Sequence, residues 1–158
     1  MAGLRYGMKT FETLSDLAQC VGQKVAVSDW ITITQEQVNQ FAQATGDHQW
    51  IHVDVEKARS GPFGAPIAHG FLTLSLLPRF FESSLHVVHS RMGVNYGLNK
   101  VRFTAPVPVG SRLRAHMTLL VCEPIDQGGM QMTWQVEVER EGADKPVCVA
   151  QSVARRYP

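Results

Sequence analysis

Residues 69–82 form an almost uninterrupted apolar stretch, and this stretch constrains the fold more than any other feature of the sequence. Read as a helix, HGFLTLSLLPRFFE is apolar on nearly every side, and such a helix is stable only when other elements surround it. We therefore predict a buried helix over these residues, with a kink or an early end at Pro78, whose ring interrupts helical hydrogen bonding. The apolar part is too short to span a bilayer, and Arg79 interrupts it, so we expect no membrane segment.

The sequence after this helix has the pattern of consecutive β-strands, over residues 91–103, 112–123, 130–141 and 146–156. In the third of these, apolar and polar residues alternate from Met132 to Glu139, as in an antiparallel sheet with one exposed face. Glycine-containing turns separate the last three strands. The predicted fold class is α+β, with an antiparallel sheet wrapped around one long buried helix.

The first half of the chain mixes strand and helix patterns. Residues 24–33 predict a strand, and Thr34 is a suitable N-cap for a helix that Gly46 ends. Residues 47–54 predict a loop or turn, and residues 55–60 predict a short helix. Beyond that helix, the glycine- and proline-rich sequence is typical of a loop.

Length and charge narrow the class of protein. With 158 residues we expect one domain over residues 1–158. Fifteen basic and 14 acidic residues give a net charge of +1, which argues against a nucleic-acid partner and against a membrane surface. Three dispersed cysteines form no disulfide or metal motif, and residues 1–10 lack the apolar run of a secretory signal, so we expect a cytoplasmic protein.

Most polar residues with chemical potential lie between Asp47 and His69. Asp47 and His52 are five residues apart across the predicted turn, so a loop can bring a carboxylate and an imidazole to the same water molecule. Such a pair is suited to general acid–base catalysis, because an imidazole takes and gives protons near neutrality. The alternatives are that Asp47 is a capping or turn residue and that His52 is a hydrogen-bonded loop histidine.

Gly70 follows His69 at the predicted start of the buried helix. The free amides of a first helical turn can stabilise a developing enolate oxygen on a thioester carbonyl. Small size for packing is the alternative reason for Gly70, and a structural role is the favoured reading of His69. The spacing of the nearby His and Asp residues matches no common zinc motif, so we expect no metal. The sequence offers no nucleophile and no cofactor-binding loop.

These motifs together resemble a known family. The pattern G-D-x(4)-H-x-D followed by P-I-A-H-G-F resembles the hydratase-2 signature of the MaoC-like dehydratases, the (R)-specific enoyl-CoA hydratases of the hotdog fold. A closer similarity is to the branch that includes nodulation protein N and mycobacterial 3-hydroxyacyl-thioester dehydratases. That branch shares DHQWIH, GPFG and NYGLNKVRF, at residues 47–52, 61–64 and 95–103.

The resemblance implies a lyase that interconverts trans-2-enoyl and (R)-3-hydroxyacyl thioesters. Asp47 and His52 would be its catalytic dyad, and the amide of Gly70 would hold the thioester oxygen. It implies no cofactor, because coenzyme A or an acyl carrier protein is part of the substrate. It also implies a homodimer, which suits a chain with a long edge strand.

Three further residues are candidates for the substrate pocket: Trp50, Asn95 and Asn99. Trp50 marks a departure, because many family members have Asn-Pro where this chain has Gln49-Trp50. The sequence leaves open the acyl-chain length, its branching and the choice between coenzyme A and carrier protein. The fold also hosts other functions, so an acyl-CoA thioesterase and a non-catalytic acyl-thioester binding domain remain the alternatives.

Overall fold

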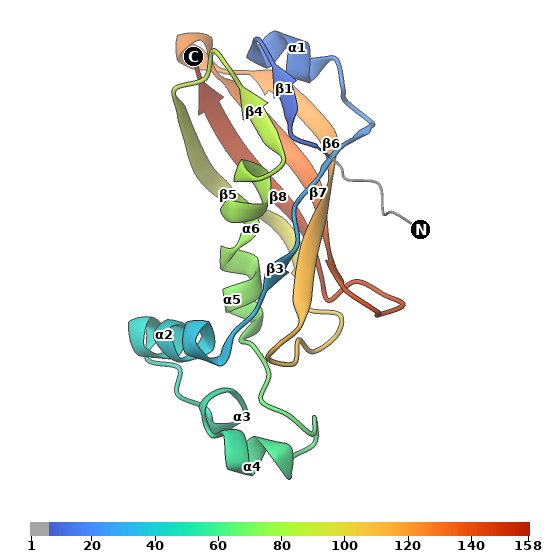
Figure 1. The fold of residues 1–158 in the computed structure, drawn as a ribbon. Helices are drawn as coiled ribbons and strands as arrows, with labels where there is room; N and C mark the ends of the chain where they lie inside the picture. Colours follow the sequence, from blue (N-terminus) through green and yellow to red (C-terminus); the bar gives the residue numbers. More distant parts are fainter. Residues whose placement is uncertain (1–6) are drawn as a thin grey trace.

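A computed structural model describes residues 7–158 of the chain (Figure 1). The first six residues, part of the segment for which we expect no secretory signal and of the predicted 1–158 domain, lie outside the described residues. The strands are β1 (Lys9–Phe11), β2 (Lys24–Val27), β3 (Ile31–Thr32), β4 (Leu85–Val87), β5 (Met92–Arg102), β6 (Arg112–Pro124), β7 (Met130–Arg140) and β8 (Cys148–Tyr157). The α-helices are α1 (Leu14–Ala18), α2 (Gln35–Thr45), α3 (Trp50–Val53), α4 (Val55–Arg59), α5 (Gly70–Ser75) and α6 (Leu77–Glu82).

Six strands form one antiparallel sheet in the order β2-β6-β7-β8-β5, with β3 also paired to β6. The predicted hairpins join β6, β7 and β8, but β5 precedes them in sequence and pairs with β8 at the far edge. A second, two-stranded parallel sheet of β1 and β4 was not predicted, because each strand has only three residues.

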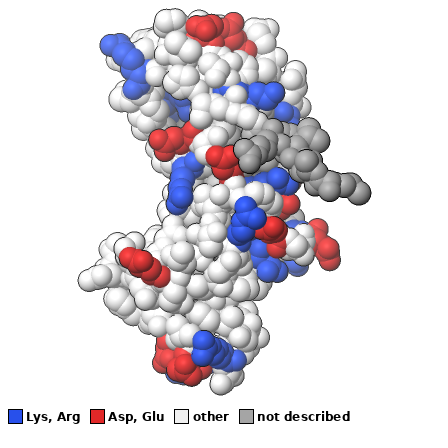
Figure 2. All heavy atoms as spheres, viewed as in Figure 1, with Lys and Arg blue, Asp and Glu red and all other residues white. Residues whose placement is uncertain are grey.

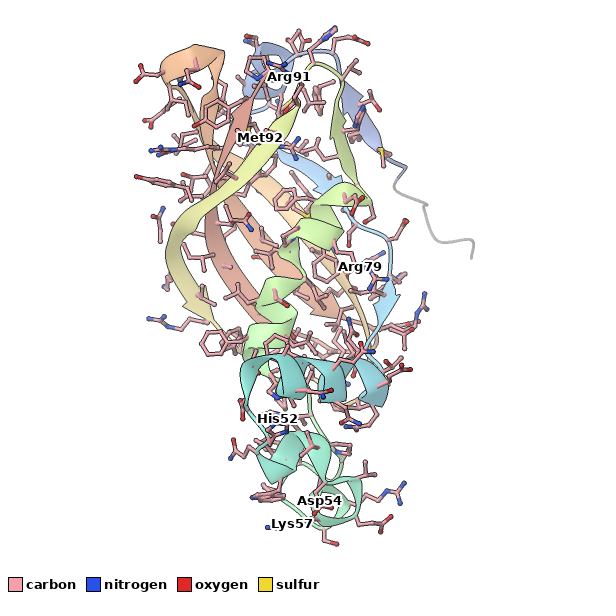
Figure 3. All side chains as sticks on the ribbon, turned by 90° about the vertical axis from the view of Figure 1, so that its left-hand side faces the viewer. His52, Asp54, Lys57, Arg79, Arg91 and Met92 are labelled. Carbon is pink, nitrogen blue, oxygen red and sulfur yellow. The ribbon has the colours of Figure 1, made fainter. Side chains whose placement is uncertain are left out.

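The core lies between one face of this sheet and the helices α5 and α6, which cross it (Figures 1 and 3). The predicted alternation in β7 is confirmed, because Met132, Trp134, Val136 and Val138 are all buried. From the helix side, Leu77 and Phe80 belong to the same buried cluster. The α+β plan, an antiparallel sheet curved around central helices, is therefore confirmed.

The central helix is divided rather than continuous. α5 ends at Ser75 and α6 begins at Leu77, with Pro78 in the first turn of α6. Proline has no amide hydrogen to donate to the carbonyl of Leu74, so an uninterrupted helix would lose a hydrogen bond and clash there. The predicted interruption at Pro78 is thus confirmed. Because a proline inside a continuous helix is unfavourable, two short helices form in place of the one long helix that we predicted. Phe71 is 68% exposed, so the element is not buried on every side.

In the first half, the predicted helix ends are confirmed. The Thr34 hydroxyl accepts a hydrogen bond from the amide of Gln37, and Gly46 ends α2 with a left-handed φ of 83°, where glycine is favoured. The prediction of a loop over 47–54 was incomplete, because α3 forms within it. The predicted 24–33 strand is broken into β2 and β3, between which Ser28 bonds to the amide of Ala115.

Charged side chains of both signs are interspersed on the face shown in Figure 2, with wide uncharged areas between them. No single-signed patch dominates that face, as the near-neutral composition predicts. None of the helices between residues 7 and 158 is both long and apolar enough to cross a membrane.

Candidate active site

The left-handed turn at Gly46 sets the position of Asp47. It ends α2 and sends the chain back toward α3, with Asp47 at the bend. The amide of Asp47 donates to the Thr45 hydroxyl at 3.4 Å, and the Asp47 carboxylate accepts from the amide of Gln49 at 3.3 Å. Its side chain is 50% exposed. Asp47 therefore stabilises a turn, as the alternative reading held, and also keeps carboxylate oxygen accessible.

His52 lies in α3, just below α2 in Figure 3, and is 6% exposed. Its Nδ1 lies 2.6 Å from the carbonyl oxygen of Ile67. Because a carbonyl only accepts hydrogen bonds, Nδ1 carries the hydrogen and Nε2 is left with a lone pair. The backbone contact thus fixes the tautomer that a general base requires.

The pKa of His52 is lowered, chiefly because burial disfavours the charged imidazolium. The hydrogen bond to Ile67 opposes this shift, the nearby His69 adds to it, and Asp47 opposes it. Because burial dominates, His52 is neutral near neutral pH. A neutral imidazole with a free Nε2 can accept a proton from water.

His69 proves to be part of the same cluster, although the sequence favoured a structural role. It is the N-cap of α5 and only 3% exposed. Its Nε2 donates to the Asp47 carbonyl at 3.0 Å and lies 4.0 Å from the Asp47 carboxylate. Its ring stacks on His52 with centroids 3.9 Å apart. The adjacent His-Gly pair at the helix start was the only sequence signal for this placement.

The side-chain donor atoms of Asp47, His52 and His69 all lie within 4.8 Å of one another. This proximity brings together residues that the sequence separates by up to 22 positions. The two imidazole rings are stacked, with their planes inclined by 23°. The Nδ1 hydrogen of His52 is donated to the Ile67 carbonyl, and the Nε2 hydrogen of His69 is donated to the Asp47 carbonyl. The remaining nitrogen of each ring can accept a hydrogen bond from water or ligate a metal ion.

Gly70 is the first residue of α5, beside this cluster. Its own amide donates to no acceptor within residues 7–158, whereas the amides of Leu72 and Thr73 bond to His69. A Cβ atom at residue 70 would lie 2.7 Å from the ring of Phe103. Glycine therefore serves close packing here, as the alternative reading held, and leaves a backbone donor free.

The candidate pocket residues lie in different places. Trp50 packs within its own segment, against Gly61 and 4.7 Å from the ammonium of Lys57. Asn99 is exposed on β5, whereas Asn95, also on β5, lines two adjoining pockets of about 550 and 360 Å³.

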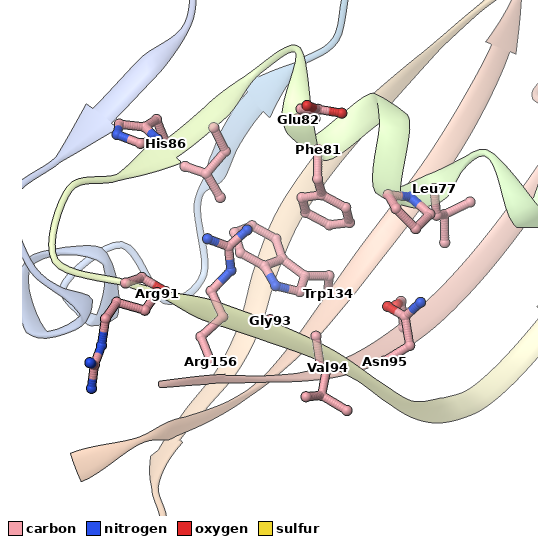
Figure 4. A pocket seen from close by; sticks show the side chains of 15 residues that line it. Leu77, Phe81, Glu82, His86, Arg91, Gly93, Val94, Asn95, Trp134 and Arg156 are labelled. Atoms are coloured by element: carbon pink, nitrogen blue, oxygen red, sulfur yellow. The ribbon is translucent and has the colours of Figure 1, made fainter. Parts of the chain in front are cut away.

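These two pockets form a continuous groove between the helices and the strands β5 and β8, which we call the helix groove (Figure 4). Both pockets are lined by Leu77, Pro78, Asn95 and Ser152. The smaller one extends toward Leu74 in α5, and the larger one toward Phe81, Trp134 and Arg156. The groove thus follows the central helices away from the Asp47–His52 pair.

The fold and the site define a class of protein: a hotdog domain with a carboxylate and an imidazole beside the start of its central helix. Residues 16–141 match the family described as MaoC like domain. The chain is 58% identical over 148 residues to 3-hydroxyacyl-thioester dehydratase Z of Mycobacterium tuberculosis, covering 94% of this chain and 98% of that protein. It is 43% identical over 140 residues to nodulation protein N of Rhizobium leguminosarum, covering 87% of each.

A solved structure, described as the monoamine oxidase regulatory protein of Archaeoglobus fulgidus, superposes with a TM-score of 0.74 at 25% identity. That match covers 96% of this chain and 99% of the other. The chain therefore belongs to the MaoC-like dehydratase family, which confirms the family resemblance and the hotdog fold.

Proposed function

We propose that this protein is a hydro-lyase that interconverts trans-2-enoyl thioesters and (R)-3-hydroxyacyl thioesters. The observation that carries the proposal is the convergence of Asp47, His52 and the Gly70 end of α5. The similarity to a relative named as a 3-hydroxyacyl-thioester dehydratase supports the reaction class. No redox or group-transfer cofactor enters the proposal, because the addition of water needs only proton transfer.

In the hydration direction, the Asp47 carboxylate and Nε2 of His52 hold one water molecule against C3 of the enoyl group. As the water oxygen bonds to C3, His52 takes a proton from it, and the π electrons move to the thioester oxygen. The amide of Gly70 stabilises the resulting enolate, and one such donor typically contributes about 10²–10³-fold. The Asp47–His52 pair then returns a proton to C2, which completes the addition. Dehydration follows the reverse path.

The test is the loss of conjugated-enoyl absorbance when the protein meets crotonyl-CoA, with chiral analysis of the product. We expect the (R)-3-hydroxy product from the wild type and a loss of about 10²–10⁴-fold in kcat/KM in Asp47→Asn and in His52→Gln. His48→Gln is the matched control, because His48 is an exposed histidine of the same segment. Nearly full hydration activity in a folded Asp47→Asn protein would contradict the assignment. Thiol release from a saturated acyl-CoA would instead indicate a thioesterase.

We also propose that two copies pair along β5 to form a homodimer. β5 is an 11-residue edge strand, and its apolar residues Met92, Val94, Tyr96 and Leu98 are each more than 40% exposed. A long apolar edge is prone to aggregation unless another strand covers it, and a second copy offers a matching strand.

The three cysteines are unpaired, which supports a reducing, cytoplasmic location.

A further inference from the structure

Arg156 occupies a position where the strand pattern expects a small or apolar side chain. Successive side chains of β8 alternate between the two faces of the sheet. On the face that meets the helices, Cys148 and Ala150 are buried, and Ser152 and Ala154 line the helix groove. Arg156 is the next residue on this face and also lines the groove. On this face of β8, the small residues Ser152 and Ala154 are thus followed by the charged side chain of Arg156.

This guanidinium has no acidic partner in the part of the chain that the structure describes. Within residues 7–158, no carboxylate lies within 4.0 Å of Arg156, whereas Arg112 and Arg114 are paired with Glu141 and Glu139. Arg156 is partly buried, and burial lowers its pKa. Buried charges are normally paired, because an unpaired charge away from water is unfavourable.

The surroundings of Arg156 direct it into the groove. Figure 4 shows Arg156, Trp134 and Glu82 among the side chains that line the larger pocket. Glu82 is the acidic residue among them, and no ion pair between Glu82 and Arg156 forms within residues 7–158. Gly93 is the partner of Arg156 on β5 and also lines the larger pocket, and a Cβ atom there would make an ordinary van der Waals contact with the Arg156 side chain at 4.0 Å.

The groove runs from Leu74, near the candidate active site, to Arg156. Leu74 is one helical turn beyond Gly70 on the same side of α5, and the groove continues past Leu77 to Phe81. From Gly70 to Phe81 the helices rise roughly 16 Å, at about 1.5 Å per residue. An extended chain advances about 1.2 Å per bond, so roughly 13 bonds span this distance. A thioester carbonyl at Gly70 and a group at Arg156 can therefore belong to one acyl chain.

We propose that the helix groove binds an acyl chain whose far end carries a carboxylate, held by the guanidinium of Arg156. This inference rests on the proposed function and names its substrate class: long-chain enoyl and 3-hydroxyacyl thioesters with a terminal carboxylate. Phe81 and Trp134 provide apolar walls for the methylene groups, and the planar guanidinium matches a carboxylate with two parallel hydrogen bonds. The carboxylate of the ligand supplies the negatively charged partner that Arg156 lacks among the described residues.

The test compares two substrates of equal length: trans-2-dodecenoyl-CoA, which ends in a methyl group, and its counterpart with a terminal carboxylate. We expect wild-type kcat/KM for hydration to be about 10- to 100-fold higher for the carboxylate-ended chain, as for a hydrogen bond between charged groups. Arg156→Met should bring this preference to one or invert it. Arg156→Lys keeps the charge but loses the planar group that makes two parallel hydrogen bonds, so it should retain part of the preference.

Arg155→Met is the matched control. Arg155 is the neighbouring arginine, but it bonds to Gln131, contacts Tyr96 and does not line the groove, so its loss should leave the preference at the wild-type value. Thermal melting confirms that each variant is folded. A wild type that hydrates crotonyl-CoA but does not prefer the carboxylate-ended chain overturns this inference alone. A wild type that hydrates no enoyl thioester overturns the proposed function itself.

Discussion

Replacing His69 by phenylalanine separates two roles that the structure gives this buried ring. The ring stacks on His52 and tilts against Phe41, and phenylalanine keeps both packing contacts. It cannot donate the hydrogen bond that Nε2 makes to the Asp47 carbonyl at 3.0 Å. A neutral hydrogen bond contributes about 1 kcal/mol to the free energy of unfolding, so His69→Phe should fold with a modest loss of stability.

The effect on activity should be much larger. The segment holding Asp47 is fixed on one side by the turn at Gly46 and on the other by His69. A shift of about 1 Å in a catalytic group can cost about 10²-fold, so we expect a loss of that order in kcat/KM for hydration of crotonyl-CoA by His69→Phe. His69→Gln is the matched variant, because its side-chain amide can donate to the same carbonyl. It should recover most of the lost activity.

The pH profile of kcat/KM reports the second role. Burial and then the proximity of His69 lower the pKa of His52, so its acid limb lies below about pH 6.5, the ordinary value for histidine. Removing the imidazole at residue 69 raises the pKa of His52, and the acid limb should move to higher pH in both variants. If His69→Phe keeps full activity, or if His69→Gln is as impaired as His69→Phe, the reasoning about this hydrogen bond is refuted.

Three further outcomes are expected. Gly70→Ala should fold, because the exposed ring of Phe103 can move aside, but the new methyl group should displace the thioester carbonyl and lower kcat/KM by about 10²-fold in the same assay. The unfolded chain binds a proton at His52 more readily than the folded chain, so the stability from this group is complete above about pH 6.5 and is lost as pH falls through its lowered pKa. Denaturant unfolding at several pH values should therefore show a weaker acid dependence in His52→Gln than in wild type. Leu98→Lys on β5 should yield monomers by light scattering, and an unchanged dimer would place the interface elsewhere.

Local sequence patterns predicted most of the secondary structure. Thr34 and Gly46 mark the ends of α2 because capping depends on side chains only a few residues away. The alternation in β7 names its buried face because the two faces of a strand repeat every second residue. Pro78 placed the interruption of the central helix for an equally local reason.

The pairing of strands that lie far apart in the sequence could not be predicted from local patterns. The position of β5 beside β8, rather than beside β6, depends on contacts between residues 92–102 and 149–157. β1 and β4 were missed because strands of three residues carry almost no periodicity. The short helix α3 was missed for a similar reason, since it forms within a segment that has the composition of a turn.

For the site, the sequence by itself singled out Asp47, His52 and Gly70 as the candidate residues, because they stand in a motif of fixed spacing. Only the tertiary structure decided the state of these groups. The tautomer of His52 depends on the Ile67 carbonyl 15 residues away, and its lowered pKa depends on burial by several elements. The place of His69 against Asp47 and the position of Arg156, which has no carboxylate partner among the described residues, are likewise products of packing. Hydrogen bonding and desolvation act between groups that are close in space, and a linear sequence does not record that proximity.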